Sequence, residues 1–73
     1  MSDVKNIAVI TPLKREFDIY SRDNANDNIR FVHVFTDDHI RGIRFNSIIK
    51  LYRWFDIKNI DEIIENINRR MIQ

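Results

Sequence analysis

The sequence is short of residues that constrain a chain: it has no cysteine, one glycine and one proline among 73 residues. Without cysteine the chain forms neither a disulfide nor a thiolate metal site, and a Cys-His catalytic pair is excluded. With one glycine it cannot contain the Gly-x-x-x-x-Gly-Lys-Ser/Thr loop, whose backbone amides bind nucleotide phosphates. No Ser-His-Asp arrangement is visible either. We therefore expect a protein that is not an enzyme and that has no cofactor and no resident metal.

Charge of one sign is also lacking, because 12 lysine and arginine residues nearly balance 11 acids and leave a net charge of +1. No overall field therefore attracts nucleic acid or a membrane surface. No apolar run approaches the roughly 20 residues of a membrane-spanning helix. The first residues, Met-Ser-Asp-Val-Lys, contain no apolar signal core. We expect a cytoplasmic protein with no membrane contact.

The length predicts a single domain over residues 1–73. A domain of this size buries only about 60% of the surface that its unfolded chain exposes. Small domains commonly add disulfides, a metal or a second subunit to a core of this size. Because disulfides are excluded, we expect a homodimer.

The first half of the chain predicts a strand, a helix and a second strand. Residues 6–11 (Asn-Ile-Ala-Val-Ile-Thr) form the continuous apolar run of a strand that is buried on both faces. Thr11 and Pro12 then predict the start of a helix, with Thr11 as its cap. The helix runs to about Arg22, and residues 28–35 form the second strand. The apolar stripe of the helix is Leu13, Phe17 and Tyr20.

The second half predicts a short turn, a third strand and a final helix. Thr36 caps a single helical turn, and Gly42 closes it in a left-handed conformation. Residues 45–54 form the third strand. Asn59 and Glu62 have the spacing of a capping box at the start of the last helix. The apolar face of that helix is Ile60, Ile63, Ile64, Ile67 and Met71.

The order β-α-β-β-α predicts a small α/β domain, half of a Rossmann-like unit. Short strand–helix–strand connections give right-handed parallel crossovers. We expect a three-stranded, mostly parallel sheet in the order 2-1-3, with helices on its faces. A third strand that runs antiparallel is the alternative.

Two motifs resemble small uncharacterised proteins encoded by bacteriophages: Ile-Thr-Pro after the first strand, and Asp-Asp-x-Ile-Arg-Gly-x-Arg-Phe-Asn-x-Ile-Ile before the third. The second motif is also similar to the segment before the acidic strand of helicase and terminase ATPases. The phosphate-binding loop is missing, and the third strand leads into Tyr52-Arg53-Trp54 in place of paired acids. The resemblance therefore implies a truncated ATPase scaffold without ATP hydrolysis. The residues that carry it are Thr11, Pro12, Arg41, Gly42, Arg44 and Phe45.

One candidate site is the rim beyond the carboxyl ends of the strands, where open parallel sheets bind ligands. His39 and the acids beside it suit a divalent metal, a nucleotide or an acid–base pair. In the other interpretation, the acids stabilise a capped turn and His39 is solvated. The rim residues are Thr11, Lys14, Asp37, Asp38, His39 and Asp56.

A second candidate is the basic and aromatic segment around the third strand. Cations suit phosphates and rings suit stacked bases, whereas Trp, Tyr and Arg are also typical of protein interfaces. We expect Lys50, Tyr52 and Trp54 to alternate onto one strand face, or Trp54 to cover the last helix. The residues of this candidate are Arg41, Arg44, Lys50, Tyr52, Arg53, Trp54 and Phe55.

The hypothesis that these patterns favour is a small non-enzymatic binding or regulatory protein. The resemblance implies that it is encoded by a phage and that its partner is a host or phage protein. Nucleic-acid binding by the basic and aromatic segment is the first alternative. Binding of a nucleotide or metal at the strand ends is the second.

Overall fold

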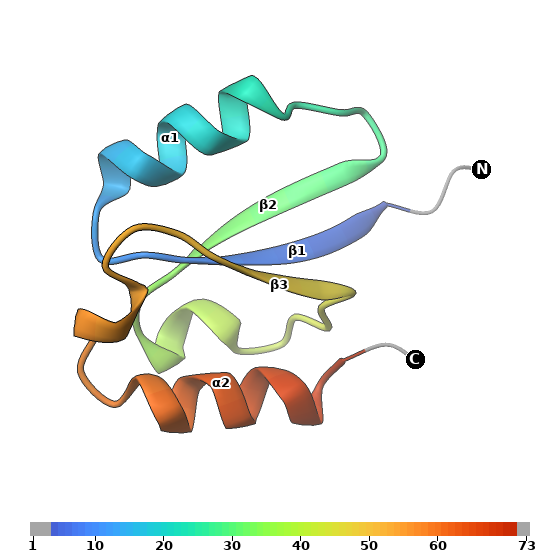
Figure 1. Ribbon diagram of the computed structural model, residues 1–73. Coiled ribbons are helices and arrows are strands. Elements are labelled where there is room, and N and C mark those ends of the chain that lie inside the picture. The colour runs from blue at the N-terminus through green and yellow to red at the C-terminus, as the bar shows by residue number, and fades with distance from the viewer. Residues whose placement is uncertain (1–3, 72–73) are drawn as a thin grey trace.

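The sheet has three parallel strands in the order β2-β1-β3, as a computed structural model describes them for residues 4–71 (Figure 1). The predicted order is confirmed, and the alternative of an antiparallel third strand is wrong because β3 pairs parallel to β1. The strands are β1 (Lys5–Ile10), β2 (Ile29–Val34) and β3 (Ser47–Lys50). The helices are α1 (Lys14–Asp23) and α2 (Ile60–Arg69), with short 3-10 turns η1 (Asp37–Ile40) and η2 (Trp54–Asp56).

The central strand β1 is apolar on both faces because helices lie on both sides of it (Figure 1). Ala8 and Ile10 face α2, whereas Val9 faces the side of α1, and all three are fully buried. β1 therefore contributes to two layers of packing, which is why its sequence does not alternate.

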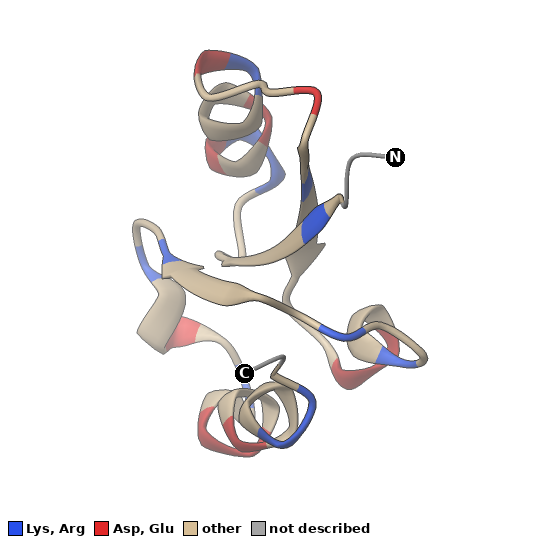
Figure 2. Ribbon diagram, turned by 90° about the vertical axis from the view of Figure 1, so that its right-hand side faces the viewer, with Lys and Arg blue, Asp and Glu red and all other residues tan. Residues whose placement is uncertain are grey.

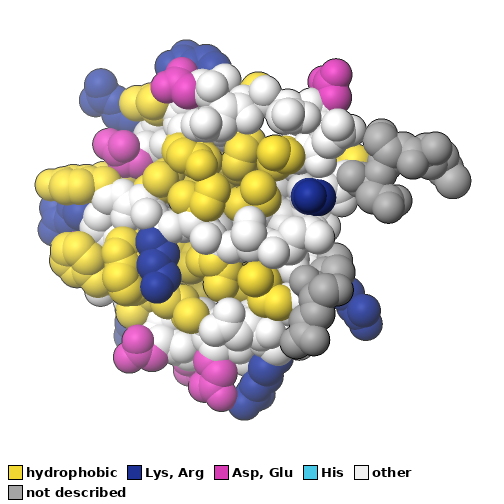
Figure 3. Space-filling model, turned by 45° about the vertical axis from the view of Figure 1, so that its right-hand side comes forward, with side chains coloured by type: hydrophobic (Ala, Val, Ile, Leu, Met, Phe, Trp, Pro, Cys, Tyr) yellow, Lys and Arg dark blue, Asp and Glu magenta, His cyan; other side chains and the backbone are white. Residues whose placement is uncertain are grey.

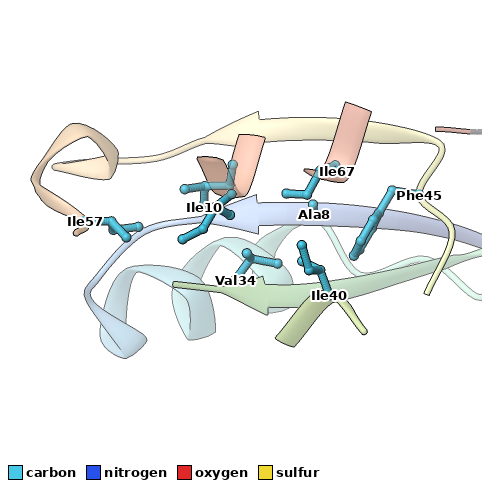
Figure 4. Packing of buried hydrophobic residues seen from close by; sticks show 8 residues of the cluster. Ala8, Ile10, Val34, Ile40, Phe45, Ile57 and Ile67 are labelled. Atoms are coloured by element: carbon cyan, nitrogen blue, oxygen red, sulfur yellow. The ribbon is translucent and has the colours of Figure 1, made fainter. Parts of the chain in front are cut away.

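The main core lies between the sheet and α2 (Figure 4). Ile63 and Ile67 of α2 pack there against β1, and Phe45 enters from the segment before β3. Each fully buried side chain of this size contributes about 1.5–3 kcal/mol relative to an exposed one. The buried cluster is Ala8, Ile10, Val34, Ile40, Phe45, Ile57, Ile63 and Ile67.

The layer on the other face is thinner, because α1 has no fully buried residue. Two ring contacts join α1 to β2: Phe17 stacks on His33 with centroids 4.7 Å apart, and Tyr20 meets Phe31 edge to face at 5.5 Å. None of the helices in residues 4–71 is long and apolar enough to cross a membrane.

The predicted start of the first helix is wrong by two residues. α1 begins at Lys14, and Leu13 occupies the cap position without a side-chain hydrogen bond. The Thr11 hydroxyl instead accepts a hydrogen bond from the Leu13 amide at 3.2 Å and donates one to the Tyr52 carbonyl at 3.0 Å. Its tertiary bond to the distant Tyr52 keeps Thr11 in the sheet layer.

The third strand is shorter than predicted and ends at Lys50. After it, the Leu51 amide donates to the Ile10 carbonyl at 3.0 Å, and the chain turns through Arg53 at φ 62°. The expected alternation of Lys50, Tyr52 and Trp54 on one strand face is therefore wrong, because two of these residues lie beyond the strand.

The ends of the last helix also differ from the prediction. Asn59 directly precedes α2, but it has a left-handed φ of 61° and makes no side-chain cap bond, so the predicted capping box does not form. Met71 lies beyond the helix, in a parallel bridge to Phe45. Thr36 also makes no cap bond, whereas Gly42 has the predicted left-handed conformation, with φ +72°.

Candidate functional site

The carboxyl ends of β1 and β3 lie side by side, which is where an open parallel sheet offers a ligand crevice. Here the space is closed by the protein itself. The Thr11 hydroxyl bonds the Tyr52 carbonyl, the Leu51 amide bonds the Ile10 carbonyl, and Thr11 is fully buried. The polar groups at this position are used by the fold.

The remaining rim residues do not converge on one site. Lys14 is exposed at the start of α1, and His39 packs among rings after β2. Among residues 4–71, no three His, Asp or Glu side chains lie together in an arrangement that could hold a metal ion. Each rim acid instead has a separate polar neighbour: Asn66 Nδ2 at 3.4 Å from Asp37, Arg41 Nε at 3.7 Å from Asp38, and Arg53 Nε at 2.6 Å from Asp56.

Both histidines have structural partners. His33 Nε2 donates to the Thr11 carbonyl at 2.9 Å, since a carbonyl only accepts. His39 Nδ1 accepts from the Phe35 amide at 3.3 Å. Their rings also stack, with centroids 6.4 Å apart. The two histidines thus join α1, β2 and η1, and His39 Nδ1 is engaged within the fold.

A hollow of about 240 Å³ lies between the end of β2 and the start of α2. Asp37 contributes an acid and Lys58 a base to its wall, so the charges oppose each other within it. The lining residues from α2 and from the loop before it were not predicted as part of a site, because no sequence motif marks them. The lining residues are Phe35, Thr36, Asp37, Lys58, Asn59 and Ile63.

The segment after β3 presents an aromatic corner, which we define as Tyr52, Trp54 and Phe55. Tyr52 is 66% exposed and Phe55 is 64% exposed. Trp54 is half-buried, packs against the main core and meets the Phe55 ring edge to face at 6.0 Å. The corner therefore combines one anchored ring with two rings that face solvent.

Local hydrogen bonds connect the residues of the aromatic corner. The Trp54 amide donates to the Leu51 carbonyl at 3.1 Å, and the Asp56 amide donates to the Arg53 carbonyl at 2.9 Å. The side chains of Arg53 and Asp56 also pair at 2.6 Å. The hydrogen bond to Asp56, and then its charge, raise the pKa of Arg53.

The cations of the basic and aromatic segment are largely engaged. Arg41 lies beside Asp38, Arg53 pairs with Asp56, and Lys50 Nζ lies 4.5 Å from the Trp54 ring centre. Arg44 lines a hollow of about 340 Å³ with Arg70, whose Nη1 donates to the Ile40 carbonyl at 2.6 Å. The structure thus gathers the aromatic residues and Lys50 at one corner and sets Arg41 and Arg44 apart from them.

The outer edge of β3 is a feature that the motifs did not single out. The Asn46 amide bonds β1 through the Asn6 carbonyl at 2.7 Å. The Leu51 amide bonds the Ile10 carbonyl and Ala8 pairs with Ile48, so by the alternation of a parallel strand the amides and carbonyls of Ser47 and Ile49 face β1, whereas those of Ile48 and Lys50 point away from it. The predicted order 2-1-3 already placed this strand at an edge, which is the signal that could have identified it.

No family model, no curated protein sequence and no solved structure matches the chain. The likeness to phage-encoded proteins with a truncated ATPase scaffold stays a prediction.

Proposed function

We propose that this is a small non-enzymatic binding protein that contacts another protein through the aromatic corner. The observation that carries the proposal is the exposure of Tyr52 and Phe55 on a segment held by local hydrogen bonds. Large exposed rings next to an arginine have the composition of an interface hot spot. The resemblance to phage-encoded proteins adds the expectation that the partner is a host protein and that the function is its regulation.

The conformation of the corner supports this function in energetic terms. Binding orders side chains and loops, which costs about 0.5–1.5 kcal/mol for each rotamer-rich side chain that is immobilised. Tyrosine and phenylalanine have only two side-chain torsions, and their backbone is already fixed by the Arg53–Asp56 pair and the Thr11–Tyr52 bond. A partner that covers these rings therefore gains apolar burial at a low ordering cost.

Nucleic-acid binding has less support from the same residues. Phosphate binding needs several cations that are free to face one strand. Arg41 and Arg53 lie within 4 Å of carboxylates, and the Lys50 ammonium lies over a ring that a base would have to reach. The corner is better suited to an apolar protein surface than to a nucleic-acid backbone.

The experiment compares the intact protein with variants as bait in an extract of the host cell. The test variant is the double substitution Tyr52→Ala and Phe55→Ala, and the matched control is Leu13→Ala with Ile19→Ala, two exposed apolar residues at and near α1. Loss of a hot spot costs 2 kcal/mol or more, so we expect the test variant to bind the captured protein at least about 30-fold more weakly. The control should retain it.

Two results would contradict the proposal: equal capture by both variants, or binding of oligonucleotides with a steep salt dependence that the corner substitutions abolish. Urea unfolding of both variants serves as the folding check. Because all four side chains are exposed, we expect each variant to stay within about 1 kcal/mol of the parent.

A further inference from the structure

Two arginines that are far apart in the sequence line one hollow of about 340 Å³, which we call the arginine hollow. Arg44 lies in the segment before β3, and Arg70 directly follows α2. The parallel bridge between Phe45 and Met71 sets these two segments side by side, with each arginine one residue before a bridged residue. The lining residues of the arginine hollow are Gly42, Ile43, Arg44 and Arg70.

A type II β-turn forms the wall of the hollow that contains Gly42. Arg41 has φ −63° and ψ 130°, and Gly42 has φ +72°. A hydrogen bond of 3.3 Å from the Ile43 amide to the Ile40 carbonyl closes the turn. The third residue of this turn requires a positive φ, which glycine adopts without strain. A Cβ on Gly42 would meet no atom within 4 Å, so a ligand can approach the backbone here.

Hydrogen bonds anchor both arginines of the hollow. Arg70 Nη1 donates to the Ile40 carbonyl at 2.6 Å, which ties this guanidinium to the turn. The Arg44 carbonyl accepts from Asn6 Nδ2 at 3.1 Å, and the next residue, Phe45, is fully buried. One guanidinium is thus tied to the wall of the hollow, and the other extends from an anchored backbone. Both features lower the cost of ordering these side chains around a ligand.

The two charges at the hollow have no acidic partner within residues 4–71. Every ion pair within 4 Å in this part of the chain joins an acid to another arginine, and none includes Arg44 or Arg70. Basic side chains are scattered among acidic and apolar ones on the face shown in Figure 3, and the chain has a net charge of +1. The arginine hollow is therefore a local positive site on a nearly neutral molecule.

We propose that the arginine hollow binds a phosphate group that carries two negative charges, either free phosphate or a phosphate monoester. A guanidinium presents its N–H groups as a planar fork that pairs with phosphate oxygens. Arg70 keeps further donors beside the one that bonds Ile40, because a guanidinium has several N–H groups. A monoester has a charge of about −1.5 to −2 at neutral pH, which matches two arginines, whereas a carboxylate supplies a single charge.

The size of the hollow suits one phosphate group better than a nucleic-acid strand. Ligand sites commonly measure about 300–1,000 Å³, and 340 Å³ lies at the small end of this range. A strand would need further cations placed along its backbone. The basic residue nearest to Arg44 in sequence, Arg41, lies beside Asp38 instead.

Titration of the intact protein with inorganic phosphate, followed by amide chemical shifts at constant ionic strength, tests the site. We expect saturable shifts at Gly42, Ile43 and Arg44, with a dissociation constant of about 1 mM or tighter. Acetate is the control ligand and should bind at least about tenfold more weakly, because it has a single charge. Shifts that do not saturate up to roughly 20 mM phosphate, or equal binding of acetate, would overturn the proposal.

Substitution of Arg44 tests the contribution of its guanidinium. The Arg44 side chain is exposed, so Arg44→Gln leaves the core intact. This variant should bind phosphate at least about tenfold more weakly, because hydrogen bonds from a charged group are lost. Arg69→Gln is the matched control, since it removes the same charge next to Arg70 from an arginine that pairs with Glu65 at 2.7 Å. We expect a change of less than about threefold in the control, and equal losses in the two variants would overturn the site.

The arginine hollow and the function proposed above fail separately. The hollow lies before β3 in the chain, whereas the aromatic corner follows it. Tyr52→Ala with Phe55→Ala should therefore leave phosphate binding within about twofold of the parent, and Arg44→Gln should leave capture of a partner protein unchanged. Loss of phosphate binding in the corner variant would overturn the assignment of the site to the arginine hollow.

Discussion

The two edges of the sheet flank the same central strand but differ in what protects them. On β2, Phe31 and His33 contact rings of α1, and Arg30 adds an exposed charge to the strand. β3 has four residues, and its one charged side chain lies over Trp54. Charged residues lie mainly on the helices, the loops and the strand ends (Figure 2). The β2 edge thus carries an exposed charge and ring contacts on one face, whereas the charge of the β3 edge lies over a ring.

The aromatic corner extends this contrast, because it follows β3 directly along the chain. Tyr52 and Phe55 are exposed to solvent a few residues after β3. The β3 side therefore brings together the features that favour association, namely free backbone groups, apolar flanks and exposed rings. We infer that β3 and the corner form the interaction side of the molecule, whereas β2 and α1 form its closed side.

The largest expected effect compares the stability contributed by a ring next to β3 with that contributed by a ring next to β2. Phe45 is fully buried just before β3, whereas Phe35 follows β2 and is 40% exposed. Phe45→Ala should lower the free energy of unfolding by about 3–5 kcal/mol, because it removes a core ring and leaves a cavity. Phe35→Ala should cost about 1 kcal/mol. Urea unfolding measures both, and equal losses would show that the two sides are anchored alike.

A smaller effect is expected from removing the charge on the β2 edge. Arg30→Ile removes the exposed charge from β2 while keeping a residue that favours strands. If charge protects this edge, the variant should self-associate roughly tenfold more tightly than the parent. Arg22→Ile removes a charge from the exposed end of α1 and is the matched control. Light scattering that does not distinguish the two variants would contradict the comparison.

The strand order could be predicted because β1 is an unbroken apolar run followed by a short strand–helix–strand connection. The helix caps could not be predicted from residue type, because backbone conformation decided them. Asn59 has a left-handed φ of 61°, and the Thr11 hydroxyl bonds Tyr52, which lies 41 residues away. Such long-range bonds have no local signal in the sequence.

The candidate site could be predicted only in part, because its long-range contacts also have no local signal in the sequence. The rings of the aromatic corner lie close together because they are adjacent in sequence, and their role as a binding site stays a prediction. The expected rim did not converge, because Asp38 and Asp56 pair with arginines only three residues away. Local charge pairs formed where the sequence pattern pointed to a long-range cluster.

Hydrogen exchange of the outward amides tests the contrast between the edges most directly. The Lys5 amide bonds the Asn28 carbonyl, so by alternation Phe31 and His33 point outward on β2, and the Leu51 amide bonds the Ile10 carbonyl, so Ile48 and Lys50 point outward on β3. From roughly 10 µM to 1 mM protein, we predict at least about tenfold slower exchange at Ile48 and Lys50, because formation of the expected homodimer through this edge follows mass action. Phe31 and His33 should not change. Exchange at Ile48 and Lys50 that does not depend on concentration, or equal protection on both edges, would contradict the account.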